Sequence, residues 1–365
     1  MKTVNVYKEE GRYAGWPANY GIWSWGDEIV VGYTLGYHSK EGGFHARDKT
    51  RPFVTMQARS LDGGETWESV EMPLRSPGNK GLSAGEHAEP KEGEGGVSVD
   101  ANEPAAVEHA IDFTHPDFAL LCARADLLGG SRSWFYTSYD RCRSWEGPYV
   151  MPMMGQIGIA ARTDYLVEGT NECLFFLTAP TVKGTETGSR VFCAKTEDGG
   201  QTFRFVSWIG PESGNGFSIM PASVRLPDSD ILVATRERRT DDEGVSRNWI
   251  ELYRSNDDGS TWTYVGRPVA DTGRGGNPPT INRLADGRLC MIYAYRDAPY
   301  GMRAKLSSDD GLTWSDEIVL GSTAGSHDIG YPRTVLRNDG TLVTVYYYND
   351  EMGGACYIAA TLWKP

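Results

Sequence analysis

The sequence predicts an all-β fold: a six-bladed β-propeller of four-stranded antiparallel sheets that spans residues 1–365 as a single domain. Three observations predict it: a turn motif that recurs along the chain, a hairpin pattern that recurs with it, and a last strand that can close a ring. Radial repetition of small four-stranded sheets is the defining feature of propellers. Very little helix is expected.

The recurring motif has the form Ser/Thr-x-Asp-x-Gly-x-Thr/Ser-Trp/Phe, with Cys142 replacing glycine in the second copy. Its five copies are SLDGGETW (60–67), SYDRCRSW (138–145), TEDGGQTF (196–203), SNDDGSTW (255–262) and SSDDGLTW (307–314). Asp and Ser side chains fix tight turns, and glycine supplies a backbone conformation that other residues avoid. We therefore interpret the five aspartates as turn formers rather than metal ligands or catalytic groups. The closing Trp or Phe is expected to bury its ring between neighbouring sheets.

Each blade also contains a hairpin pattern, in which a polar turn such as Asp-Gly joins two apolar strands. The six segments are 21–36, 110–124, 161–179, 221–238, 279–296 and 332–350. The last segment is followed by the strand ACYIAATLW (355–363) instead of the turn motif, and we expect TVNVYKE (3–9) to pair beside it and close the ring. Residues 76–104, rich in Gly, Glu and Pro, predict a long surface loop between blades one and two.

Charge and composition restrict the partners. The formal net charge of −13 disfavours nucleic acid and anionic membranes, although a local arginine cluster can still bind a small anion. No apolar run approaches the roughly 18 residues that span a bilayer. The N-terminus lacks the apolar core of a signal peptide, so we expect a cytoplasmic protein, or a periplasmic or secreted one if a signal peptide was removed. The six scattered cysteines are expected to be free, mostly buried thiols. The sequence leaves the oligomeric state open.

The five turn motifs, known as Asp-boxes, together with the six blades resemble the bacterial sialidase (neuraminidase) superfamily over essentially the whole chain. The opening WPANYGIWSWG and the closing IGYP are similar to proteins described as BNR-repeat, sialidase-like. The resemblance implies a hydrolase: an exo-acting glycosidase of a terminal, acidic sugar of a glycan, with no cofactor and no metal. Because Asp-boxes also occur in binding proteins and lyases, the function must come from the centre of the ring.

Sialidases bind the sugar carboxylate with three arginines, and they use a tyrosine nucleophile paired with a glutamate and an aspartate as general acid. The resemblance places Tyr331 at the nucleophile, and Arg236 and Arg303 at the second and third arginines. An arginine fork matches a carboxylate in two parallel hydrogen bonds. Asp48, in the loop after the first hairpin, is the expected general acid, with His38 and His45 as alternatives.

Three further residues are candidates for substrate binding. Arg162 and Asp112 lie at the start of inner strands of other blades, so both can point to the same centre, although a structural pair bridging blades is the alternative. Trp16 can stack on a sugar ring near the axis, although core packing is the more ordinary role of such a residue.

The chain departs from the sialidase pattern at two places. Gly15-Trp16-Pro17 stands where the family has its first arginine, and Met220 stands where it has the glutamate partner of the tyrosine. Two alternatives therefore stay open. One is a uronate-specific lyase or other glycosidase; in a lyase, arginine neutralises the uronate carboxylate while Tyr or His removes the C5 proton. The other is a propeller that binds glycans without catalysis.

Overall fold

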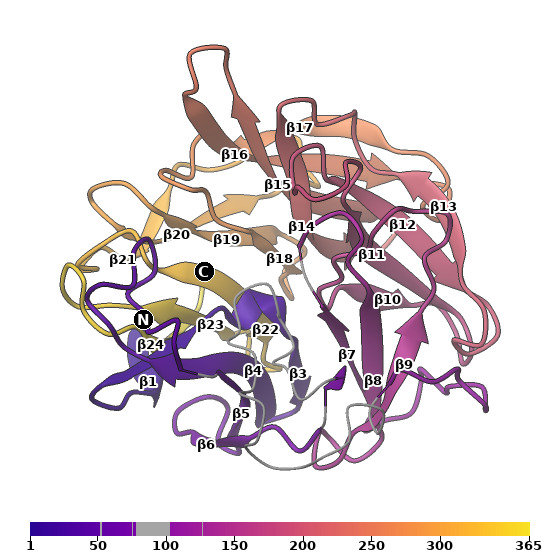
Figure 1. The fold of residues 1–365 in the computed structure, drawn as a ribbon, viewed down its shortest axis with the longest axis horizontal. Coiled ribbons are helices and arrows are strands. Elements are labelled where there is room, and N and C mark those ends of the chain that lie inside the picture. Colours follow the sequence, from indigo (N-terminus) through magenta and orange to yellow (C-terminus); the bar gives the residue numbers. More distant parts are fainter. Residues whose placement is uncertain (52, 75, 78–102, 126) are drawn as a thin grey trace.

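The computed structural model describes residues 1–365 apart from 52, 75, 78–102 and 126. Six antiparallel sheets are arranged radially around a central axis, so the predicted six-bladed β-propeller is confirmed (Figure 1). Within the described residues the one named helical element is the short 3-10 helix η1 (Pro17–Asn19). The loop predicted over 76–104 falls almost entirely outside the described part of the chain.

Four of the blades contain four strands each. Blade three consists of β10 (Tyr165–Val167), β11 (Cys173–Ala179), β12 (Arg190–Thr196) and β13 (Arg204–Trp208). Blade four consists of β14 (Gly216–Arg225), β15 (Ile231–Thr240), β16 (Ser246–Ser255) and β17 (Thr263–Val269). Blade five consists of β18 (Thr280–Arg283), β19 (Leu289–Tyr295), β20 (Gly301–Ser307) and β21 (Ile318–Gly321). Blade six consists of β22 (Gly330–Leu336), β23 (Leu342–Tyr348), β24 (Tyr357–Trp363) and the N-terminal strand β1 (Lys2–Tyr7).

The ring is closed by the two ends of the chain. Strand β1 pairs with β24 in antiparallel register, from Lys2 opposite Leu362 to Tyr7 opposite Ile358. The N-terminal segment therefore completes the last blade, as the sequence predicts. Hydrogen bonds between the first and last strands fasten the ring without covalent closure.

Blade one has an inner edge that is broken in two. Strands β2 (Arg12–Gly15) and β3 (Ile22–Trp25) both pair with the long strand β4 (Glu28–Tyr37), and β5 (Val54–Ser60) and β6 (Glu68–Glu71) complete the sheet. The break begins at Trp16, which has a left-handed φ of 58°, and continues in η1. Proline lacks the amide proton that a strand ladder requires, so Pro17 ends β2 at this point.

Blade two has three strands among the described residues: β7 (Ala119–Arg124), β8 (Ser133–Ser138) and β9 (Glu146–Met151). The prediction of a first strand within 110–124 is wrong, because only its second half forms a strand. Residues 110–118 contain a turn instead, in which Asp112 accepts hydrogen bonds from the backbone and hydroxyl of Thr114. A carboxylate that bonds its own backbone two residues on favours a turn over a strand.

The five repeated turns share one hydrogen-bond pattern. In every copy the Asp carboxylate accepts a 2.6 Å bond from the hydroxyl of the Thr or Ser four residues later, and another from that residue's amide. The aspartates are Asp62, Asp140, Asp198, Asp257 and Asp309, and their predicted role as turn formers is confirmed. Cys142 adopts a φ of 63° where the other copies have glycine, a backbone conformation that costs a non-glycine residue roughly 1 kcal/mol.

The hydrophobic core lies between the blades rather than at one centre. All seven residues of β11 and of β23 are buried, because a sheet packed between two neighbours buries both faces. The aromatic ring of each repeated turn packs against a different one of these clusters, as predicted: Trp67, Trp145, Phe203, Trp262 and Trp314. Burial of a large apolar side chain stabilises the fold by about 1.5–3 kcal/mol.

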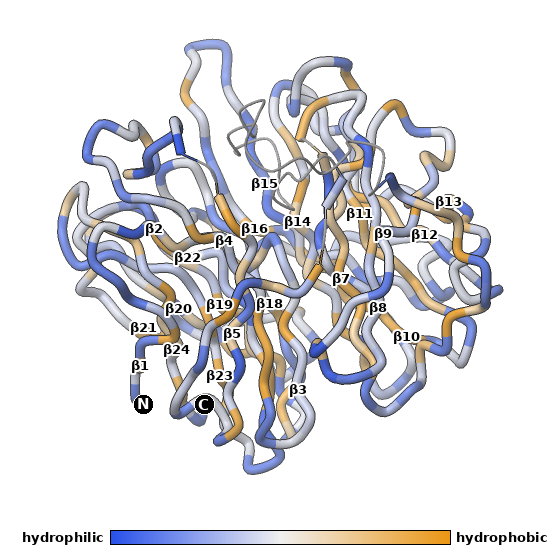
Figure 2. The backbone as a smooth tube through the Cα atoms, turned by 60° about the horizontal axis from the view of Figure 1, so that its bottom comes forward, coloured by the Kyte–Doolittle hydropathy of each residue, from blue (hydrophilic) through white to orange (hydrophobic). Residues whose placement is uncertain are grey.

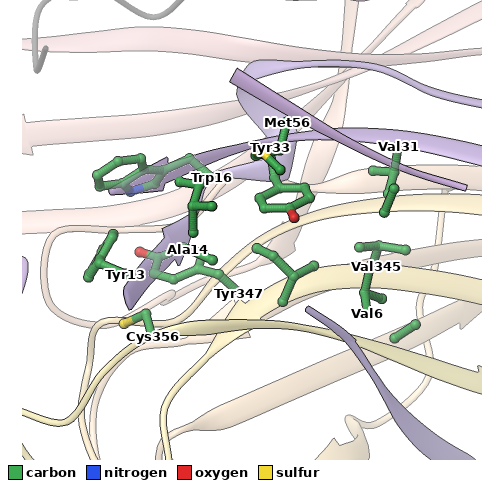
Figure 3. Packing of buried hydrophobic residues seen from close by; sticks show 14 of the residues in the cluster. Val6, Tyr13, Ala14, Trp16, Val31, Tyr33, Met56, Val345, Tyr347 and Cys356 are labelled. Atoms are coloured by element: carbon green, nitrogen blue, oxygen red, sulfur yellow. The ribbon is translucent and has the colours of Figure 1, made fainter. Parts of the chain in front are cut away.

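Two views show this arrangement. Apolar segments follow the strands, whereas many connecting loops are hydrophilic (Figure 2). The cluster between blades one and six contains Tyr13 and Trp16 beside Tyr347 and Cys356 (Figure 3). All six cysteines are free and buried, as the sequence predicts. No described helix is long and apolar enough to cross a membrane.

Candidate active site at the hub of the propeller

Tyr331 and Arg236 meet at the hub. Tyr331 lies at the start of inner strand β22, in a register shift of that strand and with a φ of 51°. Arg236 lies on β15 of blade four and donates a 3.1 Å hydrogen bond from Nη1 to the Tyr331 hydroxyl oxygen. β-Bulges with unusual backbone angles commonly redirect a side chain at a functional site. The two residues that the resemblance pairs in one site are therefore in contact.

Arg296 is a second guanidinium at this tyrosine. Its Cζ lies 5.4 Å from the centre of the Tyr331 ring. Its side chain is 2% exposed and donates to the carbonyl oxygens of Ile329 (2.9 Å) and Gly276 (3.0 Å) and to the Tyr347 hydroxyl. These bonds fix the guanidinium beside the tyrosine before any ligand arrives.

Arg303, the arginine expected at this place, is held elsewhere. It lies on β20, the third strand of blade five, and donates to the carbonyl oxygens of Pro299 (2.7 Å) and Gly321 (3.0 Å). Its nearest carboxylate is Glu317, at 3.8 Å. These partners all belong to blade five, because a third strand lies further from the axis than the first two. Arg296, and not Arg303, is the blade-five arginine at Tyr331.

Arg162 belongs to the same group of cations. It is 6% exposed, and its Nε donates to Asn19 of η1 at 2.9 Å. Burial lowers the pKa of Arg162 well below its usual value, and the positive charges of Arg124 and Arg236 lower it further. Tyr331 has the opposite effect on this pKa. These interactions place Arg162 within electrostatic range of both hub residues. The break in blade one thus positions Asn19 to orient an arginine of blade three.

A buried carboxylate, Asp328, interacts electrostatically with Arg296. Its Oδ1 is 2.7 Å from His45 Nδ1 and accepts a 2.9 Å bond from the Tyr347 hydroxyl, and its Oδ2 accepts a 3.0 Å bond from Tyr13. Burial opposes ionisation of Asp328, but His45, Arg296 and the Tyr347 hydrogen bond lower its pKa below the usual value. Asp328 is therefore a fixed negative charge that orients the His45 ring.

Three other predicted residues do not join this cluster as ligand-facing groups. Asp48 forms an exposed turn, in which one carboxylate oxygen accepts bonds from the amide (2.9 Å) and hydroxyl (2.6 Å) of Thr50. Asp112 forms the similar turn described above, and the amide of its neighbour Ile111 bonds to Gly199 of the third Asp-box. Trp16 is 2% exposed and packs against His45, so its ring is part of the core and presents no open face to a sugar.

Met220 makes the departure from the sialidase pattern concrete. It lies in a register shift of β14, with a φ of 55°, and its Sδ is 3.4 Å from Arg236 Nη1. A thioether cannot remove a proton from Tyr331. Glu237 cannot replace the missing glutamate, because successive side chains of β15 point to opposite faces and Glu237 bonds to Thr235 and Arg239. Burial raises the pKa of Glu237 to about 7.

A cavity of 320 Å³ continues along the axis beneath this cluster. It is lined by inner-strand residues, among them Asp164, Ser223, Asn282 and Arg333. Ser223 donates to the Asp164 carboxylate through its hydroxyl at 2.5 Å and its amide at 3.3 Å. Burial raises the pKa of Asp164 to about 6, although the charge of Arg333 opposes that shift. The axis thus contains two polar layers, one around Tyr331 and one around Asp164.

Two of the missed residues differ in how they could be found. Arg296 follows Ile292-Tyr293-Ala294-Tyr295 as Arg236 follows Leu232-Val233-Ala234-Thr235, so aligning the second strands of blades four and five finds it. Asp328 carries no such local signal, since its partners come from residues 13, 45 and 347. Within the described residues no group of three or more His, Cys, Asp or Glu side chains is arranged to hold a metal ion.

Comparisons with known proteins identify the architecture. No protein-family model and no curated protein matches the sequence. A protein of unknown function from Dyadobacter fermentans has a similar structure, with a TM-score of 0.72, 20% identity, and 99% and 97% of the two chains covered. An α-L-arabinanase of Penicillium chrysogenum, solved with arabinobiose, has a TM-score of 0.63 and 12% identity over 100% of this chain and 98% of its own. A sialidase of Streptococcus pneumoniae has a TM-score of 0.58 and 12% identity over 98% of this chain and 70% of its own.

These identities establish the fold alone. The chain has the six-bladed propeller architecture that is also found in arabinanases and sialidases. The predicted likeness to the sialidase superfamily is therefore supported as a likeness of fold. The substrate has to be argued from the hub itself.

Proposed function

We propose that this protein is a carbohydrate-active enzyme, an exo-acting glycoside hydrolase that removes a terminal acidic sugar, either a sialic or a uronic acid. One observation carries the proposal: Arg236 and Arg296 contact Tyr331 at the hub of the ring, with Arg162 within electrostatic range of the same tyrosine. Among the described residues, Asp328 is the carboxylate that is hydrogen-bonded into this cluster. The charge of Glu186 also acts on Arg162, so two carboxylates accompany three buried cations, and the remaining positive charge favours an anionic ligand.

The arginines would bind and orient the sugar carboxylate. Arg236 and Arg296 are 6% and 2% exposed, so little water competes for their remaining donors. Charge-assisted bonds to a carboxylate are about twice as strong as neutral ones. Phe217, Ile219 and Met220 form a buried apolar cluster against which Tyr331 packs, so water is excluded from that side of the tyrosine.

Tyr331 would attack the anomeric carbon as its phenolate, with the phenol proton passing to water. The Arg236 bond to the tyrosine oxygen stabilises negative charge there, which partly replaces the missing glutamate. His45 would protonate the leaving oxygen through Nε2, since Asp328 holds Nδ1 and Nε2 is bonded to no described residue. Water would then hydrolyse the bond between Tyr331 and the sugar. Asp48 has no part in this scheme, because its carboxylate lies in its own turn.

Met220 at the place of the general base leaves two alternative functions. Without a general base beside Tyr331, the same arginines can serve a propeller that binds acidic glycans without cleaving them. They can also serve a uronate lyase, in which His45 or Tyr331 removes the C5 proton. The likeness in fold supports hydrolysis over these alternatives, because proteins with a similar fold include an arabinanase and a sialidase, which act on glycans.

A screen of fluorogenic sialosides, uronides, rhamnosides and arabinofuranosides tests the proposal. Cleavage of an acidic glycoside is expected, with Tyr331→Phe and Arg236→Ala removing it. Arg303→Ala serves as the contrast, since Arg303 is bonded within blade five and its loss is expected to lower stability more than turnover. Activity that survives both hub substitutions refutes the site. Accumulation of an unsaturated uronate, detected by its ultraviolet absorbance, identifies a lyase, and binding without turnover identifies a lectin-like protein.

A further inference from the structure

A second cavity, of 780 Å³, lies beside the hub on the side of blades four and five. It is bounded by the end of the β15–β16 hairpin, which extends beyond its neighbours in Figure 1, and by the loops that follow β17 and β19. We call it the blade-four groove. Its charged and amide lining residues are Arg238, Arg247, Asn248, Asp271, Arg274 and Asp297.

The lining of the groove carries three arginines against two aspartates, Asp271 and Asp297, so it is weakly basic, with a formal charge of +1, on a chain whose net charge is −13. Arg247 and Arg274 are exposed, and neither forms an ion pair with another described residue. Asp271 is occupied by its own turn, since its Oδ1 accepts a 2.8 Å bond from the amide of Gly273. Arginines that are left without a carboxylate on an acidic protein create a local positive field, which attracts anions against the overall charge.

Arg238 is fixed at the inner end of the groove. It donates to Asn248 Oδ1 at 3.1 Å and to the Gly275 carbonyl oxygen at 2.9 Å. Burial lowers the pKa of Arg238, and the positive charge of Arg236 lowers it further. An anion bound against Arg238 would relieve both effects, because a nearby negative charge favours the charged form of a guanidinium.

The carbonyl group of Gly275 lies between the groove and the hub. The Gly275 oxygen accepts hydrogen bonds from both Arg236, on the hub side, and Arg238, on the groove side. The Phe44 ring packs against Gly275, where a Cβ atom would lie 2.9 Å from the ring. A side chain at position 275 would therefore clash with Phe44 at this boundary.

A smaller cavity of 260 Å³ continues the same path. Arg274 lines both cavities, and the smaller one also includes Phe44, His327 and Asp328. Asp328 belongs to the hub cluster through His45. Phe44 is 39% exposed and lies 5.8 Å from the Arg274 guanidinium, so it presents an aromatic surface where the hub opens toward the groove. Sugars stack on exposed aromatic rings of this kind.

We propose that the blade-four groove is a subsite for a second anionic group of an acidic oligosaccharide whose terminal acidic residue occupies the hub. Arg247 and Arg274, with Arg238 behind them, would bind a carboxylate or sulfate of the neighbouring residue. The natural substrate is then a polyanionic glycan rather than a single acidic sugar on a neutral leaving group. This inference rests on the proposed function, since it assumes that the hub binds the terminal residue.

The test compares the binding of one acidic residue with the binding of two. Sialic acid and α2,8-linked disialic acid form one pair, and galacturonate and digalacturonate form another. A chondroitin disaccharide carrying a uronate and a sulfate, compared with glucuronate, separates sulfate from carboxylate as the second group. Calorimetric titration measures each dissociation constant for the unmodified chain, Arg247→Ala, Arg274→Ala and the double variant. Arg283→Ala, at an exposed arginine of β18 outside the groove, is the matched control.

At least one two-residue ligand is expected to bind about tenfold more tightly than its monosaccharide. Arg247→Ala and Arg274→Ala should each reduce that advantage, and the double variant should abolish it, with monosaccharide binding and the Arg283→Ala control unchanged. The advantage should also shrink as salt is added, because exposed charges are screened.

The outcomes separate the two proposals. The subsite is refuted if no disaccharide of the three pairs gains affinity, or if the gain survives the double variant. If the subsite is refuted in this way but Arg236→Ala still abolishes monosaccharide binding, the proposed function of the hub remains supported. Disaccharide binding that depends on Arg247 and Arg274 but not on Arg236 supports the groove and refutes the hub as the site of the terminal residue.

Discussion

The aspartates of this propeller fall into two regions with opposite properties. The five Asp-box aspartates lie in surface turns, and each accepts hydrogen bonds from residues two to four positions away. Asp328 is 3% exposed at the hub, and its carboxylate bonds to residues from blade one and from the second strand of blade six. The five Asp-box aspartates stabilise turns of the scaffold. Asp328, which belongs to no repeat, is part of the hub cluster, the only one among the described residues that contains Tyr331, arginines and a histidine. Repetition within a chain therefore marks architecture, and the departures from it mark the candidate chemistry.

Arginines show the same contrast within a single blade. Arg296 and Arg303 both belong to blade five, but Arg296 follows the second strand and reaches Tyr331, whereas Arg303 is on the third strand and bonds to its own blade. Distance from the axis decides the role, since only the inner strands and the ends of the second strands border the hub. A substitution at the hub should change ligand binding or turnover, and one further out should change stability.

The largest effect is expected from Tyr331→Phe. Removal of the hydroxyl should lower kcat/KM on any acidic glycoside that the protein cleaves by about a thousandfold or more, because the nucleophile is lost. The free energy of unfolding should change by less than about 1 kcal/mol, since one hydrogen bond to Arg236 is removed. Tyr264→Phe, at a 52% exposed tyrosine of blade four, is the control. Full turnover by Tyr331→Phe would show that this hub residue is no more important for catalysis than a tyrosine at the periphery.

Asp328→Asn should produce the largest loss of stability among the aspartates. Asn keeps the shape but leaves the buried Arg296 without its nearest negative charge, and breaking such a buried charge arrangement costs about 4 kcal/mol. Asp328 has a lowered pKa in the folded state, so its contribution is present above the unfolded pKa and is lost as the pH falls through the folded pKa.

Urea unfolding at neutral and at acidic pH measures this difference. The gap between the unmodified chain and Asp328→Asn should be wide at neutral pH and close on acidification. Asp316→Asn, at an exposed aspartate of blade five, should leave the unfolding curve unchanged. Equal unfolding curves for Asp328→Asn and the unmodified chain would show that the hub carboxylate is no more structural than a surface one.

The scaffold was predictable because its signals are local. Each Asp-box contains its own donors and acceptors within eight residues, and each strand pair is joined by a short polar turn. Prediction failed at 110–118, where Asp112 and Thr114 form a turn that competes with a strand. The broken inner edge of blade one was also missed, although Trp16-Pro17 marks its position.

The hub was only partly predictable because its contacts are distant in sequence. Tyr331 and Arg236 were found through their places at strand ends, and they are 95 residues apart. The loop 36–52 offered both Asp48 and His45, but sequence position does not show which side chain turns inward. In the structure the Asp48 carboxylate is hydrogen-bonded to Thr50 in its own turn. His45 is instead hydrogen-bonded to Asp328, 283 residues away in the sequence. Only the closed ring brings those residues together.

Asp164 provides a second comparison, because its environment raises its pKa whereas the environment of Asp328 lowers the pKa of that residue. Burial raises its pKa from the usual 3.8 to about 6, so the folded chain holds this proton more tightly than the unfolded chain does. Stability should therefore decrease as the pH rises from about 4 to about 6, by at most about 3 kcal/mol from this group. Asp164→Asn, which cannot ionise, should lack that decrease.

Unfolding measured across this pH range in both proteins checks the expectation. The quantity to compare is the slope with pH rather than the absolute stability, because Asn also changes the hydrogen bonds to Ser223. Asp258→Asn, at a 73% exposed aspartate within the fourth Asp-box, should keep the slope of the unmodified chain. Parallel slopes for Asp164→Asn and the unmodified chain would show that the axial carboxylate is ionised as easily as a surface one.

The smallest effect is expected from Asp62→Ala in the first Asp-box. The carboxylate accepts bonds from Ser60, Glu65 and Thr66, and these bonds lower its pKa to about 2, with the Thr66 hydroxyl contributing most. Removing a turn-capping carboxylate of this kind costs about 1 kcal/mol. Turnover and ligand affinity should not change, since the turn belongs to the scaffold. Glu65→Ala, which removes a neighbouring exposed carboxylate, is the matched control and should be close to neutral. If Asp62→Ala instead lowered ligand affinity at unchanged stability, the repeated turns would have a role in binding, and the division between scaffold and hub would fail.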